Sequence, residues 1–139
     1  MNLTYSDELI ARVLTESWTI ALIGASARPE RASHRVMRFL QTRGHKVYPV
    51  NPREAGNTLN GETVLASLDE VPAPVDMVDI FRRSSEAGDA VDNAIRIAAK
   101  TVWLQLDVID EDAARRAEQA GLTVIMDRCP VIEYRRLGL

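Results

Sequence analysis

The sequence predicts an α/β fold: one doubly wound, Rossmann-like domain in which helices cover both faces of a five-stranded, mostly parallel sheet. Five apolar segments alternate along the chain with amphipathic helical patterns. Most of these segments are continuous apolar runs, which is typical of strands covered on both faces. A regular alternation of strand and helix favours parallel strands joined by right-handed crossovers.

We expect the five strands at residues 19–24, 46–50, 75–81, 101–106 and 122–126. A helix over residues 33–43 presents one apolar face and stops before Gly44, a typical residue after a helix end. The next helix repeats small and apolar residues, and Ser84 or Ser85 is its candidate N-cap. Asp110 is the candidate N-cap of a third helix.

Three other segments complete the chain. Residues 1–17 form an amphipathic pattern, which predicts an N-terminal helical extension packed on one side of the sheet. Residues 51–74 are a longer connection with a short strand or helix near residues 63–68. The tail, residues 131–139, predicts a short helix that either packs back over the sheet or serves a dimer interface.

Length and composition limit the class of protein. A chain of 139 residues is one domain by length, residues 1–139, and no apolar run approaches the roughly 20 residues of a membrane span. The N-terminus lacks the features of a signal peptide, and the one cysteine, Cys129, fits a reducing cytoplasm. Two histidines and one cysteine predict no conventional zinc site. A net charge of −3 argues against a general nucleic-acid binder.

Basic residues follow the first three predicted strands. Because the carboxyl ends of parallel strands meet at one edge, the loops after them converge there, and ligands of such sheets bind at that edge. After the fourth strand the charge is acidic, beginning with Asp107. An acidic protein that gathers arginine at one edge is expected to bind a small, phosphate-bearing ligand. The residues of the basic edge are Gly24, Ala25, Ser26, Arg28 and Arg31, then Asn51, Pro52 and Arg53, then Arg82 and Arg83.

The glycine pattern narrows the choice of ligand. Only Gly24 of the dinucleotide fingerprint G-x-G-x-x-G is present, and no acidic residue follows the second strand to hold a ribose hydroxyl. NAD is therefore disfavoured. Arg53 could bind a ribose phosphate, which leaves NADP or coenzyme A (CoA) open. The sequence contains no phosphate loop of the G-x-x-x-x-G-K-[ST] type, so ATP hydrolysis of that kind is not expected.

Six motifs together resemble the small bacterial CoA-binding proteins, which are stand-alone versions of the CoA-binding Rossmann-like domain of the succinyl-CoA synthetase α subunit. The motifs occur in the family's order and spacing over about residues 17–137. They are Ile23-Gly24-Ala25-Ser26, Arg31-x-Ser33-His34-x-Val36, Tyr48-Pro49-Val50-Asn51-Pro52, Val78-Asp79-Ile80-Phe81-Arg82, Val102-Trp103-Leu104-Gln105 and Asp127-Arg128-Cys129.

The resemblance implies a role for each matching position. The loop of Gly24, Ala25 and Ser26 and the start of the following helix would hold the CoA pyrophosphate, with Arg28 or Arg31 as charge partners. Val50, Asn51, Pro52 and Arg53 would border the adenosine end, and Arg53 would bind its 3′-phosphate. Phe81 and Arg82 would lie along the adenine or pantetheine path, and Leu104 and Gln105 would close the site. Relatives commonly have glycine at the position of Asp107, where a carboxylate would repel a phosphate.

The sequence favours a non-catalytic carrier or sensor of CoA or an acyl-CoA, a monomer or homodimer that could deliver CoA to a partner enzyme. Neither His34 nor His45 has an evident catalytic partner, and the chain is too short for the further domains of the synthetases. An NADP-dependent oxidoreductase and a regulatory protein with a vestigial nucleotide site remain the alternatives.

Cys129 follows the fifth strand and so lies at the ligand edge of the sheet. One hypothesis is that it forms a mixed disulfide with the CoA thiol, with Arg128 stabilising a thiolate. The other is that Cys129 is a small buried apolar residue.

Overall fold

A computed structural model describes residues 3–139 and contains the predicted five-stranded sheet. All five strands are parallel, in the order β2-β1-β5-β6-β7. The strands are β1 (Thr19–Ile23), β2 (Lys46–Val50), β5 (Met77–Ile80), β6 (Thr101–Leu104) and β7 (Thr123–Ile125). The fold prediction is confirmed.

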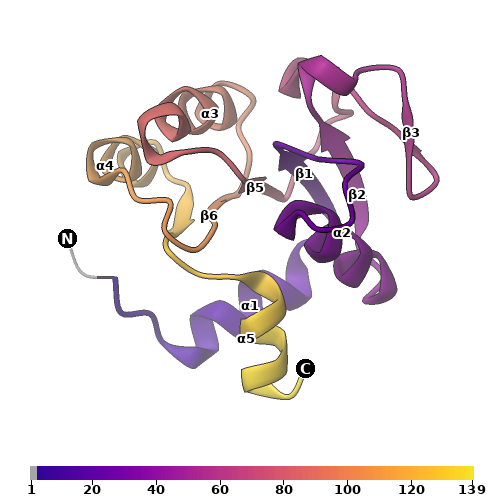
Figure 1. The fold of residues 1–139 in the computed structure, drawn as a ribbon. Helices are drawn as coiled ribbons and strands as arrows, with labels where there is room; N and C mark the ends of the chain where they lie inside the picture. The colour runs from indigo at the N-terminus through magenta and orange to yellow at the C-terminus, as the bar shows by residue number, and fades with distance from the viewer. Residues whose placement is uncertain (1–2) are drawn as a thin grey trace.

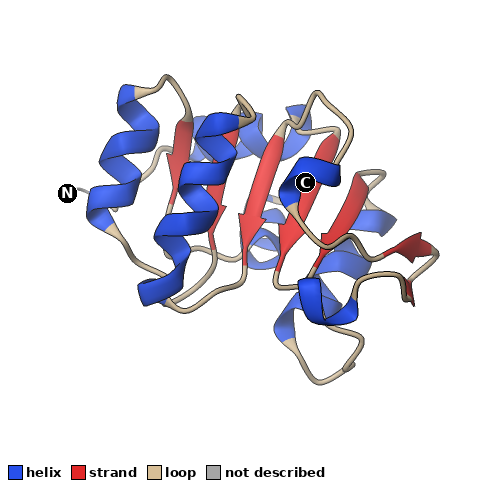
Figure 2. Ribbon diagram, turned by 90° about the horizontal axis from the view of Figure 1, so that it is seen from above, coloured by secondary structure: helices blue, strands red, loops and turns tan. Residues whose placement is uncertain are grey.

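Helices cover both faces of this sheet, as Figures 1 and 2 show. One face carries α1 (Asp7–Glu16), α2 (Ala32–Thr42) and α5 (Pro130–Leu137), and the other carries α3 (Ser84–Arg96) and α4 (Glu111–Gln119). Each layer has its own apolar core: Trp103, Met37 and Ile125 are fully buried under the first set of helices, and small residues such as Ala94 and Ala113 are fully buried under the second.

The strand order places a topological switch point between β1 and β5. The chain leaves β1 toward β2 on one side, whereas β5 lies on the other side and leads on to β6. The connections after β1 and β5 therefore run in opposite directions along the sheet, and ligands of such sheets bind at the carboxyl edge beside this point.

Most of the predicted boundaries agree with the structure to within two residues, and one predicted N-cap needs correction. Ser84 and Ser85 were both N-cap candidates, but the N-cap residue of α3 is Arg83, which makes no side-chain cap bond. Ser84 instead accepts a hydrogen bond from the Ile109 N–H and donates one to the Asp107 carbonyl, at 2.9 and 3.2 Å. Asp110 caps α4 as predicted and accepts a bond from the Ala113 N–H at 3.0 Å.

The connection over residues 51–74 contains more structure than the sequence predicts. A hairpin of β3 (Thr58–Leu59) and β4 (Glu62–Thr63) lies between two short 3₁₀ helices, η1 (Pro52–Glu54) and η2 (Leu68–Glu70). Two-residue strands are too short for any periodicity in the sequence to reveal. The hairpin projects beyond β2 at one side of the molecule (Figure 1).

The terminal helices pack against each other. The predicted extension over residues 1–17 is helical in α1 alone; residues 3–6 are not helical, and residues 1–2 lie outside the described residues. In α5, the Tyr134 hydroxyl donates to the Leu14 carbonyl at 3.1 Å, and Arg136 pairs with Asp7 at 2.9 Å. Within residues 3–139 no helix is long and apolar enough to cross a membrane.

Candidate functional site

A cavity of about 800 Å³ lies at the switch point, above the carboxyl ends of β1, β5 and β6. Residues from four separate loops and from the start of α2 line it. Ten of the residues predicted for the site are among them. These ten are Gly24, Ala25, Ser26, Arg28, Arg31, Asn51, Arg53, Phe81, Arg82 and Gln105.

Gly24 brings two of these loops into close contact. Its φ is +87°, and a Cβ at this position would lie 2.1 Å from the carbonyl oxygen of Phe81. No side chain fits there, because real Cβ contacts of that length do not occur and the obstacle is backbone. The first strand therefore has to end in glycine for the loops after β1 and β5 to meet at the crevice.

The backbone N–H groups of this loop divide into two kinds. The N–H groups of Gly24 and Ala25 both donate to the Val50 carbonyl, at 3.0 and 3.3 Å, so they join the loop to the end of β2. Within the described residues, the N–H groups of Ser26, Ala32 and Ser33 have no such partner. Ala32 and Ser33 form the first turn of α2, and free N–H groups at a helix N-terminus bind anions. The free backbone donors are therefore those of Ser26 and of the helix start, both of which belong to the segment that the sequence predicts for the site.

Five arginines line the same cavity as this helix start. Among residues 3–139, none of the five forms an ion pair, although two carboxylates, Glu54 and Asp107, also line the cavity. The carboxylate of Glu54 accepts hydrogen bonds from the Ala27 N–H and the Asn51 side chain, both at 3.3 Å. The cavity therefore carries an excess of positive charge. The five arginines are Arg28, Arg31, Arg53, Arg82 and Arg83.

Two side chains hold the loop after β1 in place. Asn51 Nδ2 donates to the Ala25 carbonyl at 2.8 Å, and Asn51 Oδ1 accepts from the Arg53 N–H at 2.9 Å. His34, which is 8% exposed, makes a hydrogen bond of 3.1 Å between Nδ1 and the Ser26 carbonyl oxygen. The sequence placed Asn51 at the site but offered no sign of the His34 contact, since the two partners lie on different elements.

A smaller cavity of about 430 Å³ adjoins the first and shares Arg82 with it. It lies between the end of β2 and the first half of α3, and Ala90, Leu68 and Ile23 give it an apolar floor. Val50 and Pro52 line this cavity and not the larger one. Leu104 lines neither, because its side chain is fully buried in the core under α3 and α4.

The loop after β6 has an unusual backbone at Asp107. Its φ is +67°, in the left-handed region, and its N–H donates to Asp127 Oδ1 at 2.8 Å. A left-handed backbone is the conformation that glycine adopts most readily, so a glycine would fit at this position without strain. Within residues 3–139 no group of three His, Cys, Asp or Glu side chains is arranged to hold a metal ion.

Comparison with known proteins shows the family to which this chain is similar. Residues 18–135 match the CoA binding domain family. The uncharacterized protein YneT of Bacillus subtilis (strain 168) is 35% identical over 120 residues, which cover 86% of this chain and 87% of YneT.

Two solved structures share the fold. A hypothetical protein from Pyrococcus horikoshii OT3 is 36% identical, with a TM-score of 0.91 over 99% of this chain and 95% of its own. A dinucleotide-forming acetyl-coenzyme A synthetase 1 from Ca. Korarchaeum cryptofilum is 26% identical, with a TM-score of 0.66 over 77% of this chain and 25% of its own. With a family match across most of its length and a relative of similar size, this chain belongs to the CoA binding domain family.

Proposed function

We propose that this protein binds CoA or an acyl-CoA in the cavity at the switch point and acts as a non-catalytic carrier or sensor of that ligand. The observation that carries the proposal is the group of five arginines, without ion pairs within residues 3–139, that line the cavity together with the first turn of α2. A polyanion of several phosphates is the ligand that such a charge distribution favours. Membership of the CoA binding domain family supports CoA as that polyanion.

The pyrophosphate would lie against the start of α2. Ser26, Ala32 and Ser33 line the cavity, and within residues 3–139 their N–H groups are free donors. Arg28 and Arg31 supply positive charge. The glycine at position 24 fits this role, because the close approach of the two loops at the crevice leaves no space for a side chain under the ligand.

The adenosine end would occupy the smaller cavity between β2 and α3. Its apolar floor suits a purine ring, and Val50 and Pro52 form its wall on the side of β2. Arg82 lines both cavities, so it would lie beside the bond between adenosine and the phosphates. Arg53, an exposed residue of η1, is our choice for the 3′-phosphate.

The pantetheine arm would leave the pyrophosphate in the other direction, past Phe81 and Gln105. Both residues line the larger cavity, and Gln105 also lines the groove between α2 and α5. The arm would thus run from the centre of the sheet toward α5.

The proposal includes the biological setting. We propose that the protein works in the cytoplasm, since its one cysteine is a free thiol, and that it delivers or reports CoA to a partner enzyme as a monomer or homodimer. The similarity to a quarter of a larger acetyl-coenzyme A synthetase supports a partnership of this kind.

A thermal-shift panel with CoA, acetyl-CoA, dephospho-CoA, NADP and ATP tests the proposal. A ligand at about 100 times its Kd adds about 2.7 kcal/mol of stability, which raises Tm by several degrees in a domain of this size. We expect shifts with the CoA species. A shift with NADP alone would contradict the proposal and favour an oxidoreductase, and no shift with any ligand would favour a regulatory protein with a vestigial site.

A further inference from the structure

A groove runs between α2 and α5 beside the proposed CoA cavity. It encloses about 690 Å³, and apolar side chains such as Val36, Phe39 and Val131 form most of its wall. Ala32, Gln105 and Leu106 line both the groove and the larger cavity. The two spaces are therefore neighbours, and a flexible arm that leaves the pyrophosphate site past Gln105 enters the groove directly.

Cys129 lines this groove. It is the N-cap residue of α5, its thiol is free, and the residue is 8% exposed. No hydrogen bond to its sulfur occurs within residues 3–139. The residue belongs to the apolar core on this side of the sheet, and the groove is the cavity that it lines within residues 3–139.

Gln105 points independently to a polar ligand at the junction of the two spaces. The residue is 6% exposed, and its Oε1 is buried without a hydrogen-bond partner in the described part of the chain. A buried amide oxygen without a partner costs about 1–3 kcal/mol, so such atoms are usually satisfied by a ligand or water. The pantetheine arm carries two amide groups, and either could bond to Gln105 as the arm passes from the cavity into the groove.

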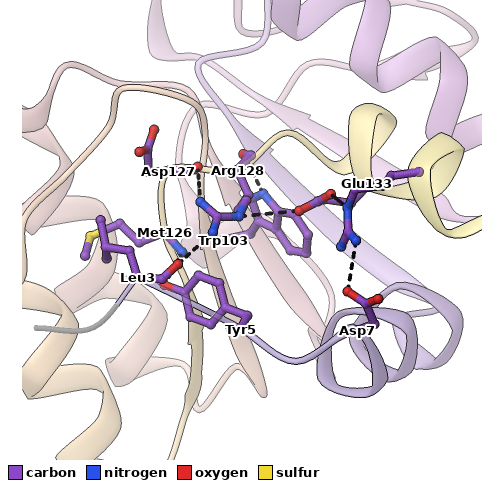
Figure 3. A network of polar contacts seen from close by, with 9 residues as sticks. Leu3, Tyr5, Asp7, Trp103, Met126, Asp127, Arg128 and Glu133 are labelled. Carbon is purple, nitrogen blue, oxygen red and sulfur yellow. Dashed lines mark hydrogen bonds and ion pairs between the residues drawn. The ribbon is translucent and has the colours of Figure 1, made fainter.

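Arg128 does not assist Cys129 in the way that the sequence suggested. Its guanidinium donates to the carbonyl oxygens of Leu3 and Asp127, at 2.7 and 2.9 Å, and lies 3.4 Å from Glu133 Oε1 (Figure 3). It therefore joins the N-terminal segment to α5. The positive charges that line the groove are those of Arg35, Arg38 and Arg135.

We infer that Cys129 exchanges with CoA disulfide and forms a mixed disulfide with CoA in this groove. The inference rests on the proposed function, because it needs the nucleotide end of CoA at the switch point. The Cys129 sulfur, after losing its proton to water, attacks one sulfur of CoA disulfide. A new S–S bond joins Cys129 to one CoA, the original S–S bond breaks, and the other CoA leaves as a thiolate that takes up a proton. Cys129 is oxidised and the departing CoA is reduced, so no other oxidant is needed.

Intact-mass spectrometry of the reduced protein after incubation with CoA disulfide tests this inference. We expect one CoA adduct per chain, removed by dithiothreitol and located at Cys129 by peptide mapping. Neither Cys129→Ser nor Cys129→Ala should form it. Glutathione disulfide, which lacks the nucleotide, should react at least ten times more slowly. Adenosine 3′,5′-bisphosphate, which has no thiol, should slow the reaction of CoA disulfide.

A separate binding measurement with reduced CoA distinguishes failure of the mixed-disulfide inference from failure of the proposed function. If reduced CoA binds to the wild-type protein and no adduct forms, the inference is overturned and the proposed function stands. An equal rate with glutathione disulfide also overturns the inference, because Cys129 would then react without any contribution from a nucleotide-binding site. If reduced CoA does not bind and no adduct forms, both the proposed function and the inference fail.

Discussion

Asn51 Nδ2 donates a hydrogen bond of 2.8 Å to the carbonyl oxygen of Ala25, and this bond joins the loop after β2 to the loop after β1. The same side chain accepts from the Arg53 N–H at 2.9 Å and so also begins η1. Asn51 is therefore a positioning residue. It sets the relative position of the loop that would hold the pyrophosphate and the arginine that would hold the 3′-phosphate.

Replacing Asn51 with Ala removes these bonds and leaves the Ala25 carbonyl without its partner. We expect a loss of about 1–2 kcal/mol in the free energy of unfolding and a several-fold weaker affinity for CoA. Denaturant unfolding and calorimetric titration measure the two effects. Asn57→Ala is the matched control, because Asn57 is exposed and only its backbone is hydrogen-bonded. Similar losses in both variants would remove the special role of Asn51.

Replacing Arg53 with Ala tests the recognition of the 3′-phosphate. Hydrogen bonds to charged groups contribute about 1.5–3 kcal/mol, so CoA should bind about tenfold more weakly or worse, while dephospho-CoA should bind nearly as before. Calorimetric titration of both ligands measures the difference. Arg12→Ala controls for the change in net charge, because it removes an exposed arginine of α1 that does not line the proposed site. Equal losses for CoA and dephospho-CoA would exclude Arg53 from this role.

Asp107 combines a left-handed backbone with a negative charge in the cavity. Asp107→Gly should strengthen CoA binding several-fold, because it removes repulsion toward the phosphates. It should leave stability unchanged or raise it by up to about 1 kcal/mol, since glycine adopts this φ without strain. Asp107→Asn removes the charge alone and should strengthen binding to the same extent. Weaker CoA binding in both variants would mean that the carboxylate helps the site.

Asp79, in the middle of β5, is fully buried, and both of its carboxylate oxygens lack hydrogen-bond partners within residues 3–139. Burial raises the pKa of this carboxyl well above its usual value. In the unfolded chain the Asp79 carboxyl loses its proton above about pH 3.9. In the folded chain it keeps its proton up to the higher, folded-state pKa. Ionisation thus stabilises the unfolded state, and the stability of the wild-type protein falls as the pH rises from about 4 to the folded-state pKa.

Asp79→Asn removes this ionisation while keeping the shape of the side chain. The variant should be more stable than the wild type at neutral pH, and its advantage should shrink as the pH falls toward 4. Urea unfolding at several pH values measures the trend. Glu16→Gln, an exposed change at the end of α1, should show no such trend. A stability difference that is constant with pH would contradict the pKa argument.

The sheet was predictable because its strands are buried on both faces. β2 lies where the sequence predicted it, and β1 is shorter by one residue, since Gly24 has already left the extended conformation. The β3–β4 hairpin was not predictable, because its strands of two residues are too short for a pattern. The predicted N-cap of α3 was wrong because the Ser84 hydroxyl forms hydrogen bonds with the loop after β6. Local propensity gives no sign of such a tertiary contact.

The residues of the site were predictable to the extent that they follow strands. Arg28, Arg53 and Arg82 lie far apart in the sequence and line one cavity, because parallel strands bring their carboxyl ends to one edge. The contacts that hold the site were not predictable. They include the hydrogen bond between His34 and the Ser26 carbonyl and the one from the Gly24 N–H to the Val50 carbonyl. Both depend on how α2 and β2 pack in the folded chain.

An NMR titration of the ¹⁵N-labelled protein with CoA would show both whether CoA binds and where it binds. We expect saturable shifts of the amide resonances of Ser26, Ala32 and Ser33, together with those after β2 and β5. Amides at the opposite edge of the sheet, such as those of Gly44 and Thr101, should stay unchanged. No shift at millimolar CoA, or shifts confined to that opposite edge, would contradict the account.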